Sequence, residues 1–457
     1  MTKVASLIAL LLIWTSCSPT EDAISFDANL EILFSNDSVA FDTLLSNSRS
    51  TTHRLMVFNP NENALILSEI FLGLDNGSDY SIVVNGKEGT GQVNEQILGG
   101  DSLMILVEAN INPRNRNTPY LVKDSIVFNW NGNTEHIKLV AWGQDANKLQ
   151  NQIVGDVTWT RDRPYIVSDT VLVPASTQLT IEAGTTVFFE NDAALFVQGS
   201  LEAVGDSDNP VIFRSARFDG IYDQVPGQWN GIYFLEGSTN NRVEYAKIFN
   251  GQIGLRLGSP DDDSIADVVV SNTEIYNMSV AGILAFTSDL EATNCLIYNC
   301  GLYLVGNFAG GNYTYQHCTF SNDQSFFVHS EPSVQFSDNI LIGENELLTD
   351  NLTVELTNCI VWGSQEEELL INNAGGAMVS AILTTNIIRF GEEVPGNFVS
   401  QTSNFPGFSN QFLFDYSLDT LAFAQNKGTA IGVGVDIIGE SRDTQPDIGA
   451  FERIDNE

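Results

Sequence analysis

The chain has 457 residues, of which 43% are hydrophobic and 17% charged, so it can bury a sizeable core and is not expected to be disordered. It has 20 Lys and Arg against 58 Asp and Glu, a formal net charge of −38. Such a surface repels nucleic-acid phosphates, so nucleic acid is not an expected partner, whereas cations such as Ca²⁺ are tolerated. The simpler interpretation of the acidity is that it maintains solubility.

The first segment predicts export. Lys3 supplies a positive charge, residues 4–14 are almost entirely apolar, and small residues then lead to Cys17. The apolar run is too short to span a bilayer, which takes about 20 residues. A Cys directly after small residues resembles the lipobox of bacterial lipoproteins, and the acidic residues that follow resemble the surface-export signal of Bacteroidetes-type bacteria. The resemblance implies a signal peptide over residues 1–16 and a lipidated linker over residues 17–23. It also implies an outer-membrane lipid, such as a palmitate chain, on Cys17, with the protein facing the cell exterior.

Residues 24–147 are predicted to form a β-sandwich, because short apolar runs alternate with turns rich in Asn, Gly and Asp. The seven runs are Leu30–Phe34, His53–Phe58, Ala64–Leu72, Tyr80–Val84, Leu103–Val107, Ser125–Trp130 and His136–Ala141. The segment resembles the immunoglobulin-like modules that precede larger domains in surface proteins of Bacteroidetes. The stretches that carry this resemblance are residues 41–43, 100–103 and 141–145.

A repeat dominates the rest of the chain. Its copies resemble Ser-Asn-Thr-Glu-Ile-Tyr-Asn, and their second positions follow one another at steps of 22, 23, 21 and 20 residues. These positions are Asn272, Asn294, His317, Asp338 and Asn358. No helical periodicity intervenes, and a repeat of this length cannot bury its apolar face alone. We therefore expect roughly nine stacked rungs of parallel strands, about 4.8 Å apart.

Two ladders are predicted within the stack. Asparagine, which tolerates a left-handed backbone, recurs in a tight turn at Asn272, Asn294 and Asn358. The next position is a cysteine column formed by Cys295, Cys318 and Cys359. We interpret these cysteines as small buried apolar residues, with a disulfide between stacked neighbours as the alternative.

This pattern resembles the right-handed parallel β-helix family. Residues 179–215 and 228–232 resemble the first rungs of bacterial members, and residues 436–452 resemble their carboxy-terminal motif. The resemblance implies an all-β protein with a right-handed parallel β-helix, a solenoid, over residues 153–400. It also implies that residues 401–457 form a segment that caps the open end of the coil, where strand edges would otherwise be unpaired.

Fold alone does not select an activity, because β-helix proteins include lyases, hydrolases, esterases, tailspikes and adhesins. A lyase needs a base near an acidic sugar, together with a cation. The basic residues of the coil to inspect for this role are Arg214, Arg217, Lys247 and Arg256. The chain has no Gly-His-Gly of the pectin-hydrolase type.

An acidic loop interrupts the repeat and offers a weak candidate metal site. Three adjacent carboxylates can place oxygens around Ca²⁺, and they belong to Asp261, Asp262 and Asp263. The alternative is a solvated turn.

Aromatic residues beside two insertions form a candidate groove for carbohydrate, since flat rings stack on sugars. They are Phe218, Tyr222, Trp229, Tyr313 and Tyr315. The alternative is that these rings cover the core beneath loops.

The sequence thus leads us to expect a surface-exposed, lipid-anchored binding or adhesion protein that presents the side of a β-helix to glycans or partner proteins. A polysaccharide-degrading enzyme of the lyase type is the first alternative. A structural component of the envelope is the second.

Overall fold

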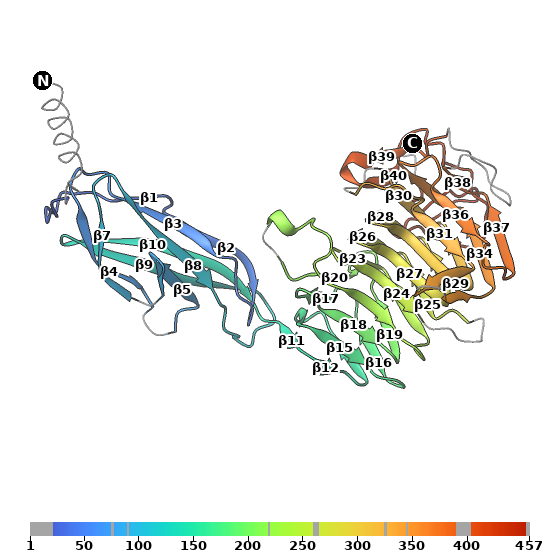
Figure 1. Ribbon diagram of the computed structural model, residues 1–457, viewed down its shortest axis with the longest axis horizontal. Coiled ribbons are helices and arrows are strands. Elements are labelled where there is room, and N and C mark those ends of the chain that lie inside the picture. The colour runs from blue at the N-terminus through green and yellow to red at the C-terminus, as the bar shows by residue number, and fades with distance from the viewer. Residues whose placement is uncertain are drawn as a thin grey trace, which may run out of the picture. The chain divides into compact units, whose positions relative to one another are not determined.

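The computed structural model describes most of the chain as two compact units that divide between Asp145 and Ala146 (Figure 1). The described residues are 22–74, 77–88, 91–217, 220–258, 265–323, 327–343, 346–389 and 404–453. Strands dominate both units, which confirms the all-β prediction. Over these ranges, no helix has the length and hydropathy that crossing a bilayer requires.

The first unit is a β-sandwich of two five-stranded sheets. One sheet has the order β1 (Leu33–Phe34), β3 (His53–Phe58), β8 (Ser102–Ala109), β5 (Tyr80–Val84) and β6 (Lys87–Glu88). The other has the order β2 (Ser38–Leu45), β10 (Asn133–Gln144), β9 (Tyr120–Trp130), β4 (Leu65–Leu72) and β7 (Gly91–Ile97). Leu55, Leu67 and Phe128 are fully buried in the core between them.

The sequence analysis missed three strands of the sandwich, and each lies at the edge of a sheet. These strands are β2, β6 and β7. An edge strand has fewer neighbours to bury it, so β7 has five exposed or half-exposed residues out of seven and no continuous apolar run. Strand β2 differs from β7, because its Val39 and Phe41 belong to the buried core.

The second unit is a parallel coil of nine turns with three strands in each turn, followed by one further strand. The first strands of the turns pair in register as a ten-stranded parallel sheet, here called the first column. In order, these are β11 (Asn147–Leu149), β14 (Tyr165–Val167), β17 (Thr186–Phe189), β20 (Val211–Ser215), β23 (Ala246–Phe249), β26 (Glu274–Met278), β28 (Leu296–Cys300), β30 (Thr319–Asn322), β35 (Ile360–Gly363) and β38 (Ile387–Ile388).

The second and third strands of the turns form two further parallel columns, which belong to one bent sheet. The second column contains β12 (Gln152–Ile153), β15 (Thr170–Val173), β18 (Ala194–Val197), β21 (Gly231–Phe234), β24 (Ile253–Gly258), β31 (Val334–Ser337) and β36 (Leu369–Asn372). The third contains β13 (Val157–Trp159), β16 (Gln178–Ile181), β19 (Ser200–Val204), β22 (Asn241–Glu244), β25 (Val268–Ser271), β34 (Leu352–Thr357) and β37 (Val379–Thr384). In turns six and seven, β27 (Ala281–Thr293) and β29 (Tyr303–Gln316) run through both columns.

One copy of the repeat does not form a rung, which corrects the prediction for residues 337–343. Strand β32 (Asn339–Ile342) pairs antiparallel with β33 (Glu346–Thr349) in a hairpin between β31 and β34. In the first column, β30 pairs directly with β35. The hairpin lengthens turn eight, so the copy at Asn358 follows the copy at His317 after about two repeat lengths. The spacing of the repeat alone therefore suggested an additional rung between these two copies.

The asparagines of the repeat occupy left-handed turns, with φ of 47° at Asn272, 53° at Asn294 and 55° at Asn358. The Asn294 side-chain amide donates to Oδ1 of Asn272 at 2.9 Å. The next position holds buried cysteines without disulfides among the described residues, namely Cys295, Cys318 and Cys359. Stacked turns therefore repeat both a hydrogen bond and a small buried side chain.

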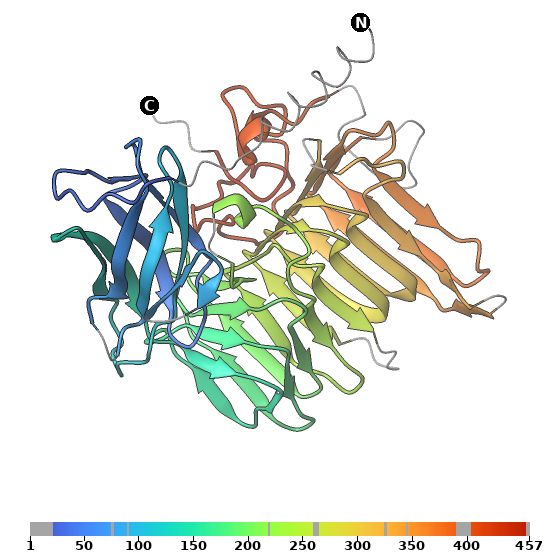
Figure 2. The same ribbon diagram turned by 60° about the vertical axis from the view of Figure 1, so that its left-hand side comes forward.

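The carboxy-terminal segment packs on the side of the coil, which corrects the expectation that it caps the open end. Described from residue 404 to 453, it contains β39 (Phe408–Asn410), η2 (Gln411–Leu413) and β40 (Asp415–Leu418). Its apolar residues share a core cluster with outward-facing residues of the first column, such as Tyr298 and Trp362 (Figure 2). These outward positions are apolar, so they need cover along the side of the coil rather than at its end.

Candidate carbohydrate-binding face

Three of the five aromatic residues expected to form a groove, namely Trp229, Tyr313 and Tyr315, are core residues. Trp229 is fully buried, stacks on Phe189 with 4.1 Å between ring centroids, and donates its indole N–H to the carbonyl of Phe249 at 2.9 Å. A ring held in this way cannot stack on a sugar. Its site in the sequence, beside an insertion, gave no indication that the side chain turns inward.

Tyr313 and Tyr315 are also buried, at 1% and 0% exposure, since both point inward from β29. Tyr313 donates its hydroxyl to the Gly310 carbonyl at 3.0 Å, and the hydroxyl of Tyr315 accepts from the side chain of Asn307. Burial raises the pKa of both phenols. Both rings therefore belong to the core of the coil itself, and neither lies beneath a loop as the alternative interpretation had it.

Of the other residues predicted for the groove and the metal site, Tyr222 belongs to the part of the chain that the structure describes. Tyr222 is half-exposed at the end of η1 (Gly220–Tyr222), with the guanidinium of Arg217 3.3 Å from its ring centroid. Phe218 and the acidic loop of Asp261, Asp262 and Asp263 fall outside the described residues. Within the described ranges, no cluster of three or more His, Cys, Asp or Glu could hold a metal ion.

A different aromatic surface lies on the outer face of the second column, here called the aromatic strip and defined by Phe196, Tyr233, Arg256, Phe286, Tyr303 and Phe308. Side chains alternate along a strand, so Leu195 and Val197 point into the core while Phe196 points outward. The same alternation places Tyr233 outward from β21. All six side chains of the strip are half-exposed.

Strand register brings the strip together over turns three to seven. Phe196 pairs with Tyr233, and Tyr233 pairs with Arg256. Phe286 pairs with Phe308 one turn later. These pairings hold the rings in sequence along the coil axis, because neighbouring parallel strands lie about 4.8 Å apart.

The contacts within the strip are aromatic and cation–π in character. Ring centroids are 5.0 Å apart for Phe196 and Tyr233, and 6.1 Å apart for Phe286 and Phe308. The Arg256 guanidinium carbon lies 5.6 Å from the Tyr233 centroid and 5.5 Å from that of Phe286. The arginine therefore bridges the two pairs of rings into one surface.

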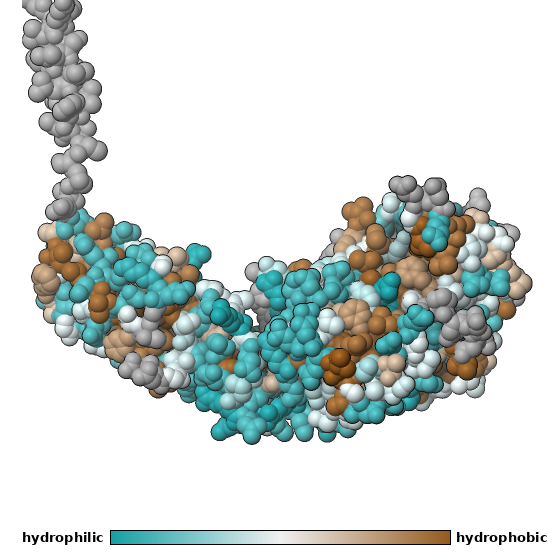
Figure 3. Space-filling view, turned by 60° about the horizontal axis from the view of Figure 1, so that its bottom comes forward, coloured by the Kyte–Doolittle hydropathy of each residue, from teal (hydrophilic) through white to brown (hydrophobic). Residues whose placement is uncertain are grey.

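The outer face of the third column differs sharply from the strip. Its outward positions are mostly small polar or acidic residues, including Thr180, Glu202, Glu291, Thr314 and Glu355. In Figure 3 hydrophilic side chains dominate the first turns of the coil, and hydrophobic ones become more frequent toward the middle and later turns. The strip is thus a local feature and not a general property of the coil surface.

A pocket of 280 Å³ lies between the first column and the carboxy-terminal segment. It is lined by Lys247 and Glu274, whose side chains form an ion pair at 2.8 Å, and by Asp415. The hydroxyl of Tyr298 donates to the same carboxylate of Glu274 at 3.0 Å. Lys247, one of the four basic residues that the sequence offered as a lyase base, therefore lies in a pocket beside carboxylates.

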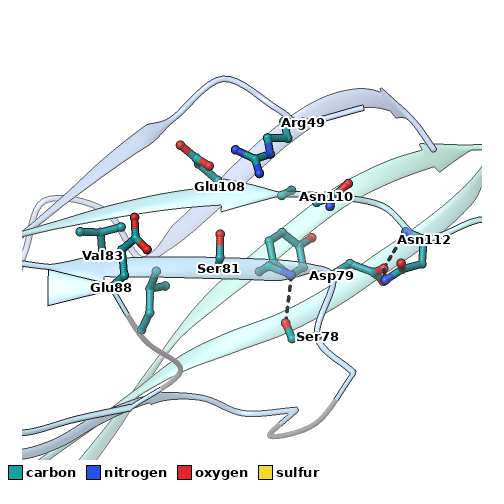
Figure 4. Close-up of a pocket in the computed structure, with 12 residues that line it drawn as sticks. Arg49, Ser78, Asp79, Ser81, Val83, Glu88, Glu108, Asn110 and Asn112 are labelled. Atoms are coloured by element: carbon teal, nitrogen blue, oxygen red, sulfur yellow. Dashed lines mark hydrogen bonds between the residues drawn. The ribbon is translucent and has the colours of Figure 1, made fainter. Parts of the chain in front are cut away.

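The sandwich has a pocket of 650 Å³ along β5 and β8 (Figure 4). Asp79 in its lining already accepts from Arg114 at 2.7 Å and from Asn112 at 2.9 Å. Tyr80 is only 5% exposed and donates its hydroxyl to Val122. This pocket therefore offers polar groups but no open ring for stacking on a sugar.

The sequence contained a signal for the strip that was not used. Phe196 and Tyr233 are the central residues of the apolar triplets Leu195-Phe-Val197 and Ile232-Tyr-Phe234. Since the flanking residues face the core, the central ring must face outward. Only knowledge of which strands are neighbours places Arg256 between those rings.

Comparison with known proteins supports the architecture. Residues 203–380 match the family model described as "Right handed beta helix region". No curated protein matches the chain. This matched range includes the strands that carry the aromatic strip from Tyr233 onward.

Similar solved structures have low identities and low TM-scores. The pectate lyase Pel9A has 15% identity and a TM-score of 0.32, with 69% of this chain and 79% of that chain covered. The catalytic unit of a GH87 α-1,3-glucanase from Streptomyces thermodiastaticus has 11% identity and a TM-score of 0.16, with 76% and 82% covered. A family 123 glycoside hydrolase from Clostridium perfringens has 8% identity and a TM-score of 0.18, and the match covers 26% of this chain and 30% of that one. These likenesses assign no activity, but the matched family model and the stacked parallel columns identify the coil of this chain as a right-handed parallel β-helix.

Proposed function

We propose that this protein binds an extended glycan chain along the aromatic strip of its β-helix. The observation that carries the proposal is a row of half-exposed side chains over turns three to seven, with aromatic rings on turns three, four, six and seven and Arg256 on turn five. Rings in such a row offer apolar faces and edges to the C–H groups of sugars. Four steps between turns three and seven make the strip about 19 Å long, which suits several sugars in a row.

The rigidity of the strip supports binding. Its side chains stand on paired strands of a stacked coil, and Arg256 contacts rings on both sides. Surfaces ordered before binding lose little conformational entropy when a ligand arrives. A long polymer can therefore bind with useful affinity by making several weak contacts with the strip at once.

We also propose that the protein is held to a membrane by an acylated Cys17, with the sandwich as a spacer and the coil presented for adhesion or capture. The support for this proposal is the apolar run that ends in small residues before Cys17. That segment lies outside the described residues.

The test is binding of the soluble chain from Ser18 onward to a panel of purified polysaccharides, both neutral and acidic. Tyr233→Ala and Phe286→Ala should each weaken binding by about tenfold, because each removes one ring of the strip. Thr314→Ala, on the outer face of the third column, is the matched control and should bind like the wild type. Equal binding by all four proteins would refute the strip as the binding surface.

A polysaccharide lyase remains the second candidate function, favoured by the pairing of Lys247 with Glu274 in the 280 Å³ pocket. A lysine in its neutral form can act as the base that abstracts a proton from an acidic sugar, so Lys247 would have to leave its ion pair and lose its proton first. Release of unsaturated sugars from the same polysaccharides, lost in Lys247→Ala but kept in Tyr233→Ala, would establish this activity. Absence of both binding and release would favour a structural role in the envelope.

A further inference from the structure

Arg256 has an unusual environment in a chain as acidic as this one. In the described part of the structure, no carboxylate lies within ion-pair distance of its guanidinium, although other basic side chains do form such pairs, among them Arg242 with Glu244. Its neighbours are instead the rings of Tyr233 and Phe286. The guanidinium is therefore a cation on an otherwise uncharged strip.

Neighbouring residues hold this guanidinium in place. A Cβ added at Gly258 would lie 3.2 Å from Nη1 of Arg256, so the glycine leaves the space that the side chain occupies. The rings on either side restrict the guanidinium further. An arginine ordered in this way keeps its planar set of N–H donors for a ligand, and that set matches the oxygens of a carboxylate or sulfate.

The large negative charge of the protein does not oppose such a contact at physiological salt. The Debye length at 0.15 M is about 8 Å, so carboxylates elsewhere on the coil are largely screened. Among the six residues of the strip, Arg256 is the one with a charged side chain, and its charge is positive. Local charge, not net charge, then decides which sugars bind.

We propose that the strip selects glycans with anionic groups, uronate carboxylates or sulfate esters, and that Arg256 is the residue that recognises them. This inference rests on glycan binding at the strip, and it adds the chemical class of the ligand. Phe196, Tyr233, Phe286 and Phe308 supply stacking that any pyranose can use. Arg256 supplies an ionic contact through its guanidinium, which only an anionic sugar can make.

The experiment compares Arg256→Gln with the wild type on polygalacturonate, on chondroitin sulfate and on a neutral glucan, at 0.15 M salt. Arg256→Gln should lose about tenfold in affinity for the anionic polymers and stay within about twofold for the neutral one. Arg242→Gln removes an equal charge from the third column and should change none of these affinities. Polygalacturonate carries carboxylates alone and chondroitin sulfate carries carboxylates and sulfate esters, so a difference in affinity between the two measures what sulfate adds.

Several results would overturn the inference. Unchanged affinity of Arg256→Gln for both anionic polymers would show that the arginine does not recognise them. An equal loss on anionic and neutral polymers, with an unaltered unfolding temperature, would show that Arg256 only supports the rings. In both cases glycan binding at the strip would stand, whereas failure of the wild type to bind any polymer would refute the proposed function itself.

Discussion

His317 and Asn358 are 41 residues apart in the chain, yet their side chains are joined by a hydrogen bond of 2.9 Å. The bond links turns eight and nine through the asparagine turn column, in which His317 takes the place of an asparagine. Burial is the main cause that lowers the pKa of His317 to about 3, and the nearby Arg442 guanidinium lowers it further. The column therefore contains one group that resists protonation while the coil is folded.

This relationship predicts a pH dependence of stability. In the unfolded chain His317 takes up a proton below about pH 6.5, whereas in the folded protein it does so only near pH 3. Between these two pH values the proton stabilises the unfolded state, so the stability of the fold decreases as the pH drops from about 6.5 toward 3. His317→Asn, which restores the residue common in this column, should retain about 1–3 kcal/mol more of its neutral-pH stability at pH 4 than the wild type does. Urea unfolding at pH 7 and pH 4 measures the difference. Parallel losses in the two proteins would contradict the assignment.

The pair Arg442 and Glu452 should hold the carboxy-terminal segment on the coil. Their side chains are 1% and 3% exposed and meet at 3.1 Å, and Arg442 also donates to Oδ1 of Asn294 at 2.9 Å. Arg442→Met leaves a buried carboxylate without its partner and should cost about 3–5 kcal/mol, with cleavage of the segment by protease. The double variant Arg442→Met with Glu452→Leu should lose clearly less. Additive losses would argue against a coupled pair.

Substitution should affect stability far more at Trp229 than at Tyr233, although the two are only four positions apart in the chain. Trp229→Ala empties a core position and should cost about 3–5 kcal/mol, whereas Tyr233→Ala removes a half-exposed ring and should cost about 1 kcal/mol. Chemical unfolding of the two variants measures both costs. A mild effect of Trp229→Ala would contradict its place in the core.

The four cysteines of the coil should be unreactive while the protein is folded. All four are fully buried, which keeps an alkylating reagent away from the sulfur, and burial raises the pKa of Cys300 to about 12 and raises the pKa of Cys295 and Cys318 as well. The chain from Ser18 onward should take up no iodoacetamide at pH 8, and four equivalents once unfolded without reductant. Fewer than four in the unfolded state would indicate a disulfide.

Acylation of Cys17 predicts a membrane-bound protein in the producing cell. Cys17→Ser should remove fatty-acid labelling and release the protein from the membrane fraction, because the apolar leader alone is too short to span a bilayer. Labelled palmitate and cell fractionation are the two readouts. A variant that stays bound and labelled would place the anchor elsewhere.

Much of the fold follows from local sequence. Each turn of the coil is short, repeats at nearly constant spacing and alternates inward and outward residues, so the stacked columns could be predicted from residues such as Asn272 and Asn294. The core strands of the sandwich were recognisable for the same reason, since burial on one face leaves a pattern of period two. Edge strands such as β7 were missed because few neighbours bury them.

The sequence by itself determined the architecture, the number of turns to within one, and the buried cysteine column. Only the tertiary structure decided that Trp229 is a core residue, that Arg256 lies between aromatic rings, that residues 337–343 form a hairpin, and that the carboxy-terminal segment covers the side of the coil. Periodicity is a local property and can be read along the chain. Whether Trp229 or Tyr233 meets a ligand depends on which strands lie beside them, and that is set by contacts between residues 20 to 40 positions apart.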